Sequence, residues 1–359
     1  MGGKRIGRRS GDPKPMKVLL LRTQEETENN KSGIGSYADT VKSVLEENGR
    51  ECEPVYLDLS RGRTLKEITV DGLGRSAVRI LKSGDADVMH AAAEHCSLLL
   101  PFFRGRKIVT LHHVIRDGEF ETKSWTLLWK LSVLTAKIFA DRFIAISPAT
   151  KKDMVEKLGI PEEKITVILH KTKPVFRRTG AQKEKCVGFV GSLIDRKNPE
   201  TAMKAFAEMK KYAGYGDWRF VVCGTGPKRE KLNALAEELG ISDSVGFVSN
   251  LSEEELCDLY NRMSLCFNTS LFEGFGAPIL ESQACGTPVF CLEGAEIPSE
   301  TLRETVLCKD AEDMAAKAVG LLEDREKLNC VTERGIKHSA SFSENYAESL
   351  FAVYDSAEK

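Results

Sequence analysis

Apolar and polar positions alternate along this chain with a period that changes repeatedly, and the same succession of changes occurs twice. Short apolar runs are typical of buried strands in a parallel sheet, and the longer stretches between them have the period of amphipathic helices. A second series of this kind runs from Val187 to Cys291. Two series predict two doubly wound, Rossmann-like α/β domains. The first series contains Val18–Leu21, Val88–His90, Ile108–Leu111, Phe143–Ile146 and Ile165–Leu169 as strands, and Tyr37–Glu47 and Leu127–Phe139 as helices.

A polar stretch separates the two series and predicts the domain boundaries. With 359 residues, 42% of them hydrophobic, the chain is long enough to bury two cores. The stretch 171–185 contains Pro174 and Gly180 and lacks apolar periodicity, so we expect a linker there. The first domain is then predicted at 16–170 and the second at 186–335.

The apolar runs and the cysteines indicate where the protein works. No apolar run approaches the roughly 18 residues that cross a bilayer, so we expect no transmembrane helix. The ten cysteines form no Cys-x-x-Cys pair, and Cys223, Cys266 and Cys291 lie inside apolar runs. This pattern favours reduced, buried thiols over a disulfide framework, and therefore a cytoplasmic location.

The net charge of −1 conceals an asymmetry between the two halves of the chain. Residues 1–180 carry 32 Lys and Arg against 23 Asp and Glu, whereas residues 181–359 carry 20 against 30. Much of the basic excess lies in 1–15, which lacks the apolar stretch of a secretory signal and is expected to be a disordered tail. A basic half fits an anionic membrane surface or a phosphorylated substrate. The alternative is a tail of solvated charges, and we expect no nucleic-acid partner.

The stretch 270–288 is the richest in candidate chemistry. An apolar strand enters a glycine-rich turn, and Pro278 suits the first turn of the helix that follows. Glu273 on the turn and Glu281 about one turn into the helix are both able to face one cleft. The alternative is an ordinary capped helix with two solvated glutamates. The amides at the start of this helix, which would attract phosphate or a developing negative charge, belong to Phe275, Gly276 and Ala277.

Other segments are informative only in combination. Gly35 lies between the first strand and the first helix, where glycine lets a backbone approach phosphate. Arg196 and Lys197 follow a strand, where cations can neutralise a diphosphate, although solvated charges on a surface turn would look the same. His112 ends another strand, and no carboxylate spacing completes a metal site around it. We therefore expect a cleft or core histidine and no metal.

Two patterns favour a structural explanation. Asp85-x-Asp87 resembles a metal-binding pair, but it precedes its strand instead of following it, so capping and turn formation are the preferred interpretation. The apolar stretch Trp125–Phe139 carries two lysines and has the composition of an interfacial helix. We favour a packed helix of the first domain over a helix in a membrane interface.

Taken together, these residues resemble glycosyltransferase family 4. The strongest likeness is Glu273-x7-Glu281 within the run from Ser270 to Val289. The resemblance extends from Met16 to the C-terminus, and the ordered combination is far more specific than any single piece. The other agreeing segments, in order, are Gly33–Gly35, Thr110–His112, Ile144–Lys151, Pro161–Ile168, Phe189–Asn198, Val222–Pro227 and Val245–Ser249.

The resemblance implies a fold and an activity. The family has two Rossmann-like domains facing a cleft (the GT-B fold), with a C-terminal helix, here 336–359, that crosses back to the first domain. It implies transfer of a sugar from a UDP-, GDP- or ADP-linked donor with retention of the anomeric configuration. The expected chemistry is a front-face attack in which the leaving phosphate takes the acceptor's proton. No bound metal or other cofactor is implied, and the acceptor would be a sugar, lipid-linked or an anionic small molecule.

The resemblance also implies roles for individual residues. Glu281 would hold the ribose hydroxyls and Glu273 the hydroxyls of the donor sugar. Lys197 would neutralise the diphosphate, and His112 would lie beside the sugar at the reaction centre. The amides of the helix start would contact sugar and phosphate, Gly35 would approach the diphosphate, and the base would lie at Val248 and Ser249. We expect three catalytic residues, His112, Lys197 and Glu273, and seven donor-binding residues, Gly35, Arg196, Val248, Phe275, Gly276, Ala277 and Glu281.

Two departures from the family pattern keep other functions open. Ser192 stands where the family often has a diphosphate-binding arginine, a role that Arg196 or Arg177 would have to fill, and 170–173 replaces a common Asn-Gly-Val-Asp. A non-catalytic nucleotide-sugar-binding or partner subunit is therefore one alternative. Another is a nucleotide-sugar epimerase, which would need acid and base residues on both sides of the sugar, and His112 alone gives little support for it.

Overall fold

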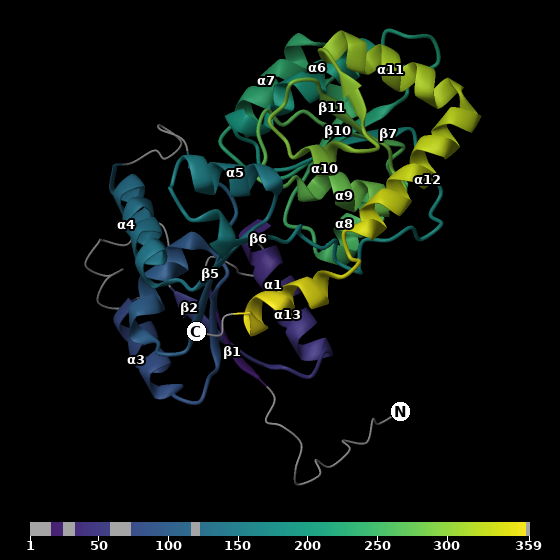
Figure 1. The fold of residues 1–359 in the computed structure, drawn as a ribbon. Helices are drawn as coiled ribbons and strands as arrows, with labels where there is room; N and C mark the ends of the chain where they lie inside the picture. Colours follow the sequence, from purple (N-terminus) through teal and green to yellow (C-terminus); the bar gives the residue numbers. More distant parts are fainter. Residues whose placement is uncertain (1–15, 24–32, 58–72, 116–122, 357–359) are drawn as a thin grey trace.

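The computed structural model describes residues 16–23, 33–57, 73–115 and 123–356. The tail predicted at 1–15 lies outside these residues. Two lobes are visible, each built on one sheet (Figure 1). The first sheet contains β1 (Lys17–Thr23), β2 (Glu51–Leu57), β3 (Val88–Ala91), β4 (Arg106–Leu111), β5 (Arg142–Ala145) and β6 (Ile165–Val167). The second contains β7 (Cys186–Val190), β8 (Arg219–Cys223), β9 (Val245–Val248), β10 (Leu265–Asn268), β11 (Val289–Leu292) and β12 (Val306–Cys308).

Both sheets are parallel throughout, and their strand orders differ. The first has the order β2-β1-β3-β4-β5-β6 and the second β12-β11-β10-β7-β8-β9. The second order is that of a dinucleotide-binding Rossmann sheet, whose chain reverses direction of growth between β7 and β10. Ligands bind outside the carboxyl ends of the strands at such a switch point. The predicted fold class, two doubly wound α/β domains, is confirmed.

Helices cover both faces of each sheet. In the first lobe, one face is packed by α3 (Gly74–Lys82), η2 (Glu94–Phe102), α4 (Lys123–Phe139) and α5 (Pro148–Glu156), and the other by α1 (Gly33–Glu47). Alternate residues of β1 point to the two faces: Leu19 and Leu21 meet the first group, Val18 and Leu20 the second. A strand buried on both faces reads as a continuous apolar run, which is why the sequence revealed it.

The second lobe repeats this layering. One face is packed by α6 (Pro199–Met209), α7 (Arg229–Glu238) and α11 (Ala311–Glu323), the other by α8 (Glu253–Arg262) and α9 (Ala277–Ala284). The short α10 (Ser299–Leu302) and the long α12 (Arg325–Ser341) complete it. All ten cysteines are free thiols and eight are buried.

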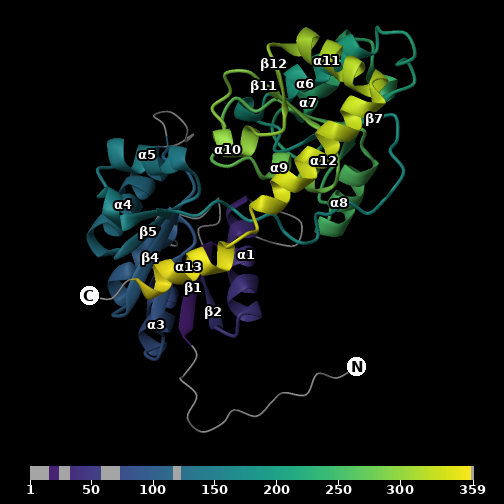
Figure 2. The same ribbon diagram turned by 45° about the vertical axis from the view of Figure 1, so that its right-hand side comes forward.

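The end of the chain returns to the first lobe. After α12, a break at Asn345 in the left-handed conformation leads into α13 (Tyr346–Asp355). Leu350 and Val353 of α13 belong to the same buried cluster as the strand residues Val18 and Leu20. In Figure 2, α13 lies against the sheet of the first lobe. The expected crossing of the last helix is thus confirmed. The domain boundary predicted between 335 and 336 falls inside α12 and stays a prediction, as do the other boundaries.

Two helix starts carry clear N-caps. The side chain of Ser147 accepts the amide of Thr150 and caps α5, and Ser252 forms a capping box with Glu255 at α8.

The edge strands β2, β9 and β12 were not among the strands expected from the sequence. In β2, Pro54 and two glutamates interrupt the apolar pattern. Proline is tolerated there because an edge strand has an unpaired side.

Candidate active site

The switch point of the second sheet brings two predicted residues together. Lys197 ends the short 3-10 turn η4 (Asp195–Lys197) after β7, and Glu273 lies on the turn after β10. Although they are 76 residues apart in sequence, the Lys197 ammonium pairs with Glu273 Oε1. Both side chains are buried. The Rossmann strand order therefore explains why these two segments meet.

Glu273 is surrounded by donors. Its Oε1 also accepts the Ser270 hydroxyl at 2.7 Å, and its Oε2 accepts Arg196 Nη1 at 3.0 Å. Burial alone would raise the pKa of Glu273, but the charges of Lys197 and Arg196 outweigh it and hold the pKa below its ordinary value. The carboxylate is therefore ionised and hydrogen-bonded. With two cations and one carboxylate, the cluster has a formal charge of +1 toward an anionic ligand, while burial lowers the pKa of Lys197 below its ordinary value.

The turn after Glu273 places backbone amides at the start of α9. Gly276 caps this helix with a φ of +92°, and a Cβ there would lie 3.2 Å from Thr301 Cγ2. Only glycine adopts that conformation easily. The first amides of a helix have no intrahelical partner, so the segment Phe275–Ala277 offers donors to an anion beside Lys197.

Glu281 lies further along α9 in a different environment. Its Oε2 accepts the Tyr260 hydroxyl at 3.0 Å. Burial raises the pKa of Glu281 to about 7, although Tyr260 and the charge of Lys173 act in the opposite direction. The two glutamates of the Glu-x7-Glu pattern are thus electrostatically unlike: Glu273 is ion-paired with a lowered pKa, and Glu281 is desolvated with a raised pKa. Tyr260 and Ser270 were not predicted, because no local pattern marks a residue that supports another side chain from a different element.

The turn also touches the first lobe. A Cβ on Gly274 would lie 2.6 Å from the backbone oxygen of His112, so the two backbones are in close contact. His112 follows β4 and is buried, and its Nε2 lies 2.8 Å from the Ala92 oxygen. A carbonyl can only accept, so Nε2 carries the proton. Burial lowers the pKa of His112, which is therefore neutral at pH 7.

A second histidine joins the lobes, and sequence reasoning marked it only as a departure from the family. The His170 ring stacks on Phe275 with centroids 5.4 Å apart. Its Nδ1 lies 2.8 Å from the Lys171 oxygen, and burial lowers its pKa to about 4. Within the described parts of the chain, its buried Nε2 has no hydrogen-bond partner. Tyr37 packs against both histidines in T-shaped geometry. Its ring centroid lies 5.0 Å from that of His112 and 5.6 Å from that of His170.

The remaining predicted residues lie close to the elements expected for them. Gly35 was expected between the first strand and the first helix and lies in the first turn of α1. Val248 ends the edge strand β9, and its oxygen accepts the amide of Gly224. Arg196 lies beside Glu273, so the departure at Ser192 leaves the cluster with two cations. The assigned roles stay predictions.

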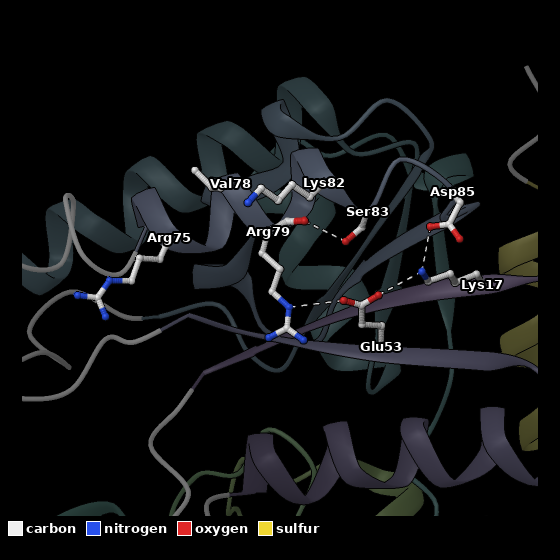
Figure 3. A pocket seen from close by; sticks show the side chains of 8 residues that line it. All are labelled: Lys17, Glu53, Arg75, Val78, Arg79, Lys82, Ser83 and Asp85. Atoms are coloured by element: carbon white, nitrogen blue, oxygen red, sulfur yellow. Dashed lines mark hydrogen bonds and ion pairs between the residues drawn. The ribbon is translucent and has the colours of Figure 1, made fainter.

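The pocket drawn in Figure 3 lies elsewhere. It lies at the amino end of β1, where Lys17 pairs with Glu53 and Asp85 and Arg79 pairs with Glu53 (Figure 3). This is the amino end of the first sheet, whereas Lys197 and Glu273 follow the carboxyl ends of strands in the second sheet. Asp85 binds the Lys17 ammonium and Asp87 accepts the Lys17 amide, which confirms their structural role. In the part of the chain that the structure describes, no three His, Cys, Asp or Glu side chains are grouped to hold a metal, and no helix is long and apolar enough to cross a membrane.

Comparison with known families agrees with this geometry. Residues 172–338 match the family model of glycosyl transferases group 1, and residues 51–170 match that of Glycosyltransferase Family 4. Among curated relatives, D-inositol 3-phosphate glycosyltransferase of Corynebacterium jeikeium is 34% identical over 48% of this chain and 43% of its own length. The protein of that name from Acidothermus cellulolyticus is 30% identical over 68% of this chain and 58% of its own length. The chain therefore spans about half the length of these relatives.

Solved structures share the fold at low sequence identity. Anabaena Alr3699/HepE in complex with UDP-glucose is 17% identical with a TM-score of 0.72, covering 94% of this chain and 100% of that one. Sucrose-phosphate synthase from Thermosynechococcus elongatus is 15% identical with a TM-score of 0.75, covering 95% and 98%. Both likenesses extend over the two lobes and establish the architecture.

Proposed function

Because the chain belongs to the glycosyltransferase family that these two models describe, we propose that it moves a sugar from a nucleotide-sugar donor to an acceptor, with retention. One observation carries the proposal: a buried Lys197–Glu273 ion pair, joined by the partly exposed Arg196, at the switch point of a Rossmann-ordered sheet. A cluster with one net positive charge beside a helix start fits a diphosphate that carries the leaving group.

The donor is bound by parts with different tasks. Lys197, Arg196 and the amides of Phe275–Ala277 receive the diphosphate, while Gly35 approaches it from the other lobe. Glu273 accepts hydroxyls of the donor sugar, and Glu281 accepts those of the ribose. The base lies near Val248. The charge on the leaving diphosphate is neutralised by side chains, so no metal ion is needed.

The proton of the acceptor goes to the leaving phosphate. Glu273 is a poor proton acceptor, because Lys197 and Arg196 hold its pKa low and both of its oxygens already accept hydrogen bonds. His112 already uses its Nε2 proton on Ala92. The chain therefore contributes positioning and charge stabilisation, which is what a front-face retaining reaction requires. Among the described residues, no strong acid and base pair surrounds the cluster. This disfavours an epimerase, which would need both groups beside the sugar.

The acceptor is contacted by the first lobe. The curated relatives are named for D-inositol 3-phosphate, so a phosphorylated cyclitol is the first acceptor to test, and a lipid-linked sugar is the second. The basic excess of residues 1–180 suits either anion. The same excess supports peripheral association with the anionic cytoplasmic face of a membrane, partly through the tail at 1–15. Replacing Arg8 and Arg9 by Gln tests the tail by sedimentation with anionic vesicles.

The experiment that tests the function measures transfer itself. Purified chain is incubated with UDP-, GDP- and ADP-sugars, with and without each acceptor, in the presence of EDTA. The expected result is release of one nucleoside diphosphate and a product whose anomeric configuration, read by NMR, equals that of the donor. An inverted product would refute the mechanism. Donor binding without turnover for every acceptor would favour a non-catalytic subunit.

A further inference from the structure

Helix α4 has a face that the fold leaves uncovered. Its inner side packs in the first core through Trp129, Val133 and Ala136. Its outer side carries five large apolar side chains between 40% and 64% exposed. In Figures 1 and 2 this helix lies on the outside of the first lobe, on the opposite face of the sheet from α1 and α13. The exposed residues are Leu127, Leu131, Leu134, Ile138 and Phe139.

The exposed side chains form one stripe. Leu127, Leu131, Leu134 and Ile138 follow one another at intervals of four, three and four residues, which places them on a narrow strip of a helix. Single exposed leucines are ordinary, but an aligned row on one element marks a surface that binds something apolar. Helix α4 therefore packs on the core, as favoured from the sequence, and also has an apolar outer side.

The charged residues of α4 beside the stripe have one sign. Lys130 and Lys137 are the charged residues among Trp125–Phe139; both are exposed, and Lys137 Nζ donates to the Leu158 oxygen at 2.6 Å. Helix α3 contacts η2, as α4 does, and packs on the same core; it exposes Val78 and Leu81 together with three cations and no acid. Val78 and Lys82 lie away from Glu53, to which Arg79 reaches (Figure 3). The cations of α3 are Arg75, Arg79 and Lys82.

We propose that the outer face of α4, flanked by α3, docks on an anionic lipid surface, with the leucine stripe in the headgroup–acyl boundary and the lysines at the phosphates. Apolar insertion and cationic attraction act together in such helices. Long lysine stems keep their ammonium groups at the polar level while the stems cover apolar surface. This inference deepens the proposed membrane association and locates it on a folded element rather than on the tail.

A second copy of this chain is a less suitable occupant. The spacing of the stripe would also fit a helix pair, but such a pair gains its specificity from opposite charges beside the seam. The stretch Lys123–Phe139 contains no acidic residue, so two copies would bring lysines near lysines without compensation. An anionic surface complements the same lysines.

The test compares vesicle binding by the full chain and by charge-inserting variants. Vesicles of phosphatidylcholine, with and without phosphatidylglycerol, are sedimented with wild type and with Leu131→Asp/Leu134→Asp. The matched control is Leu307→Asp, which alters an equally exposed leucine on β12 of the second lobe. Wild type and control are expected to bind the anionic vesicles, and the double variant about tenfold or more weakly. Lys130→Glu should weaken binding as well, whereas Lys204→Glu on α6 should not.

Several results would overturn the inference. If the double variant and Lys130→Glu both bound vesicles as tightly as wild type, the α4 face would not be the membrane contact. If the intact chain did not bind anionic vesicles, the inference would also be refuted. A dimer in solution that the double variant abolishes would identify a second copy as the occupant. The thermal shift by donor is measured on the same samples. A chain that binds vesicles through α4 but shows no shift with any donor would refute the proposed function and leave the docking face standing.

Discussion

The carboxyl edges of the two sheets touch at Gly274 and His112 and are built in opposite ways. On the second sheet, Lys197, Arg196 and Glu273 form a charged, hydrogen-bonded cluster. On the first, His112 and His170 are buried and uncharged at neutral pH, and Tyr37 packs between them. Yet the first half of the chain is the basic one and the second the acidic one. Overall charge therefore does not reveal where an anion binds; the local cluster does.

The largest expected effect comes from removing the central charge of the second edge. Lys197→Met should lower turnover about 10²- to 10³-fold and weaken donor binding less, because its charge acts most on the leaving diphosphate. Turnover and donor affinity are measured separately, by steady-state kinetics and calorimetry. Lys185→Met, at an exposed lysine paired with Asp217 in the same lobe, is the control. An unchanged turnover would show that the diphosphate lies elsewhere.

Glu281, the second glutamate of the Glu-x7-Glu pattern, should make the stability of the fold depend on pH. Its pKa of about 7 lies above the ordinary 4.5, so the native state holds the proton more tightly than the unfolded chain. The associated stability is fully present below pH 4.5 and is lost as pH rises through 7, amounting to about 3 kcal/mol. Glu281→Gln should therefore stabilise the fold at pH 8 and change little at pH 5, while weakening donor binding.

Urea unfolding at both pH values measures this difference. Glu237→Gln on the exposed side of α7 serves as the control and should give equal changes at the two pH values. A Glu281→Gln variant that is destabilised equally at pH 5 and pH 8 would mean that the carboxyl is not desolvated in solution.

The contact between the two edges should tolerate no added atom. In Gly274→Ala the new Cβ would meet the His112 backbone at 2.6 Å, so the lobes must separate slightly. We expect a loss of about 1–3 kcal/mol, expressed in kcat/KM more than in the melting temperature, since each lobe keeps its own core. Gly246→Ala on β9, where a Cβ would touch nothing, is the control. Equal activity of the two variants would indicate that the crevice is open during turnover.

The smallest effect on stability is expected from replacing His170, on the uncharged edge of the first sheet. His170→Phe keeps a ring against Phe275 and removes the bond to Lys171, so stability should change by about 1 kcal/mol or less. Because the pKa of His170 is about 4, the variant should leave the pH profile between 6 and 8 unaltered. A profile that loses an inflection near 6.5 would show that this histidine titrates in the working range.

What the sequence could predict depended on whether the signal was local. The alternating series predicted most of the inner strands, because a strand buried on both faces appears in the sequence as a run of adjacent apolar residues. Glu273 and Lys197 were found through ordered motifs. The contacts Gly274–His112 and Phe275–His170 were not, since they join residues far apart in the chain. For Trp125–Phe139 the sequence left a packed helix and a membrane-interface helix as alternatives, because an apolar pattern does not say which side the core covers.

The central claim is that the charged edge binds a nucleotide-sugar without a metal. The most direct measurement is a thermal-shift screen of the full chain against UDP-, GDP- and ADP-sugars in EDTA and in magnesium, since a ligand bound only to the native state must stabilise it. We expect a shift with one nucleotide family that is the same in EDTA and in magnesium and is smaller in Glu281→Gln. No shift with any donor, or a shift that requires magnesium, would contradict it.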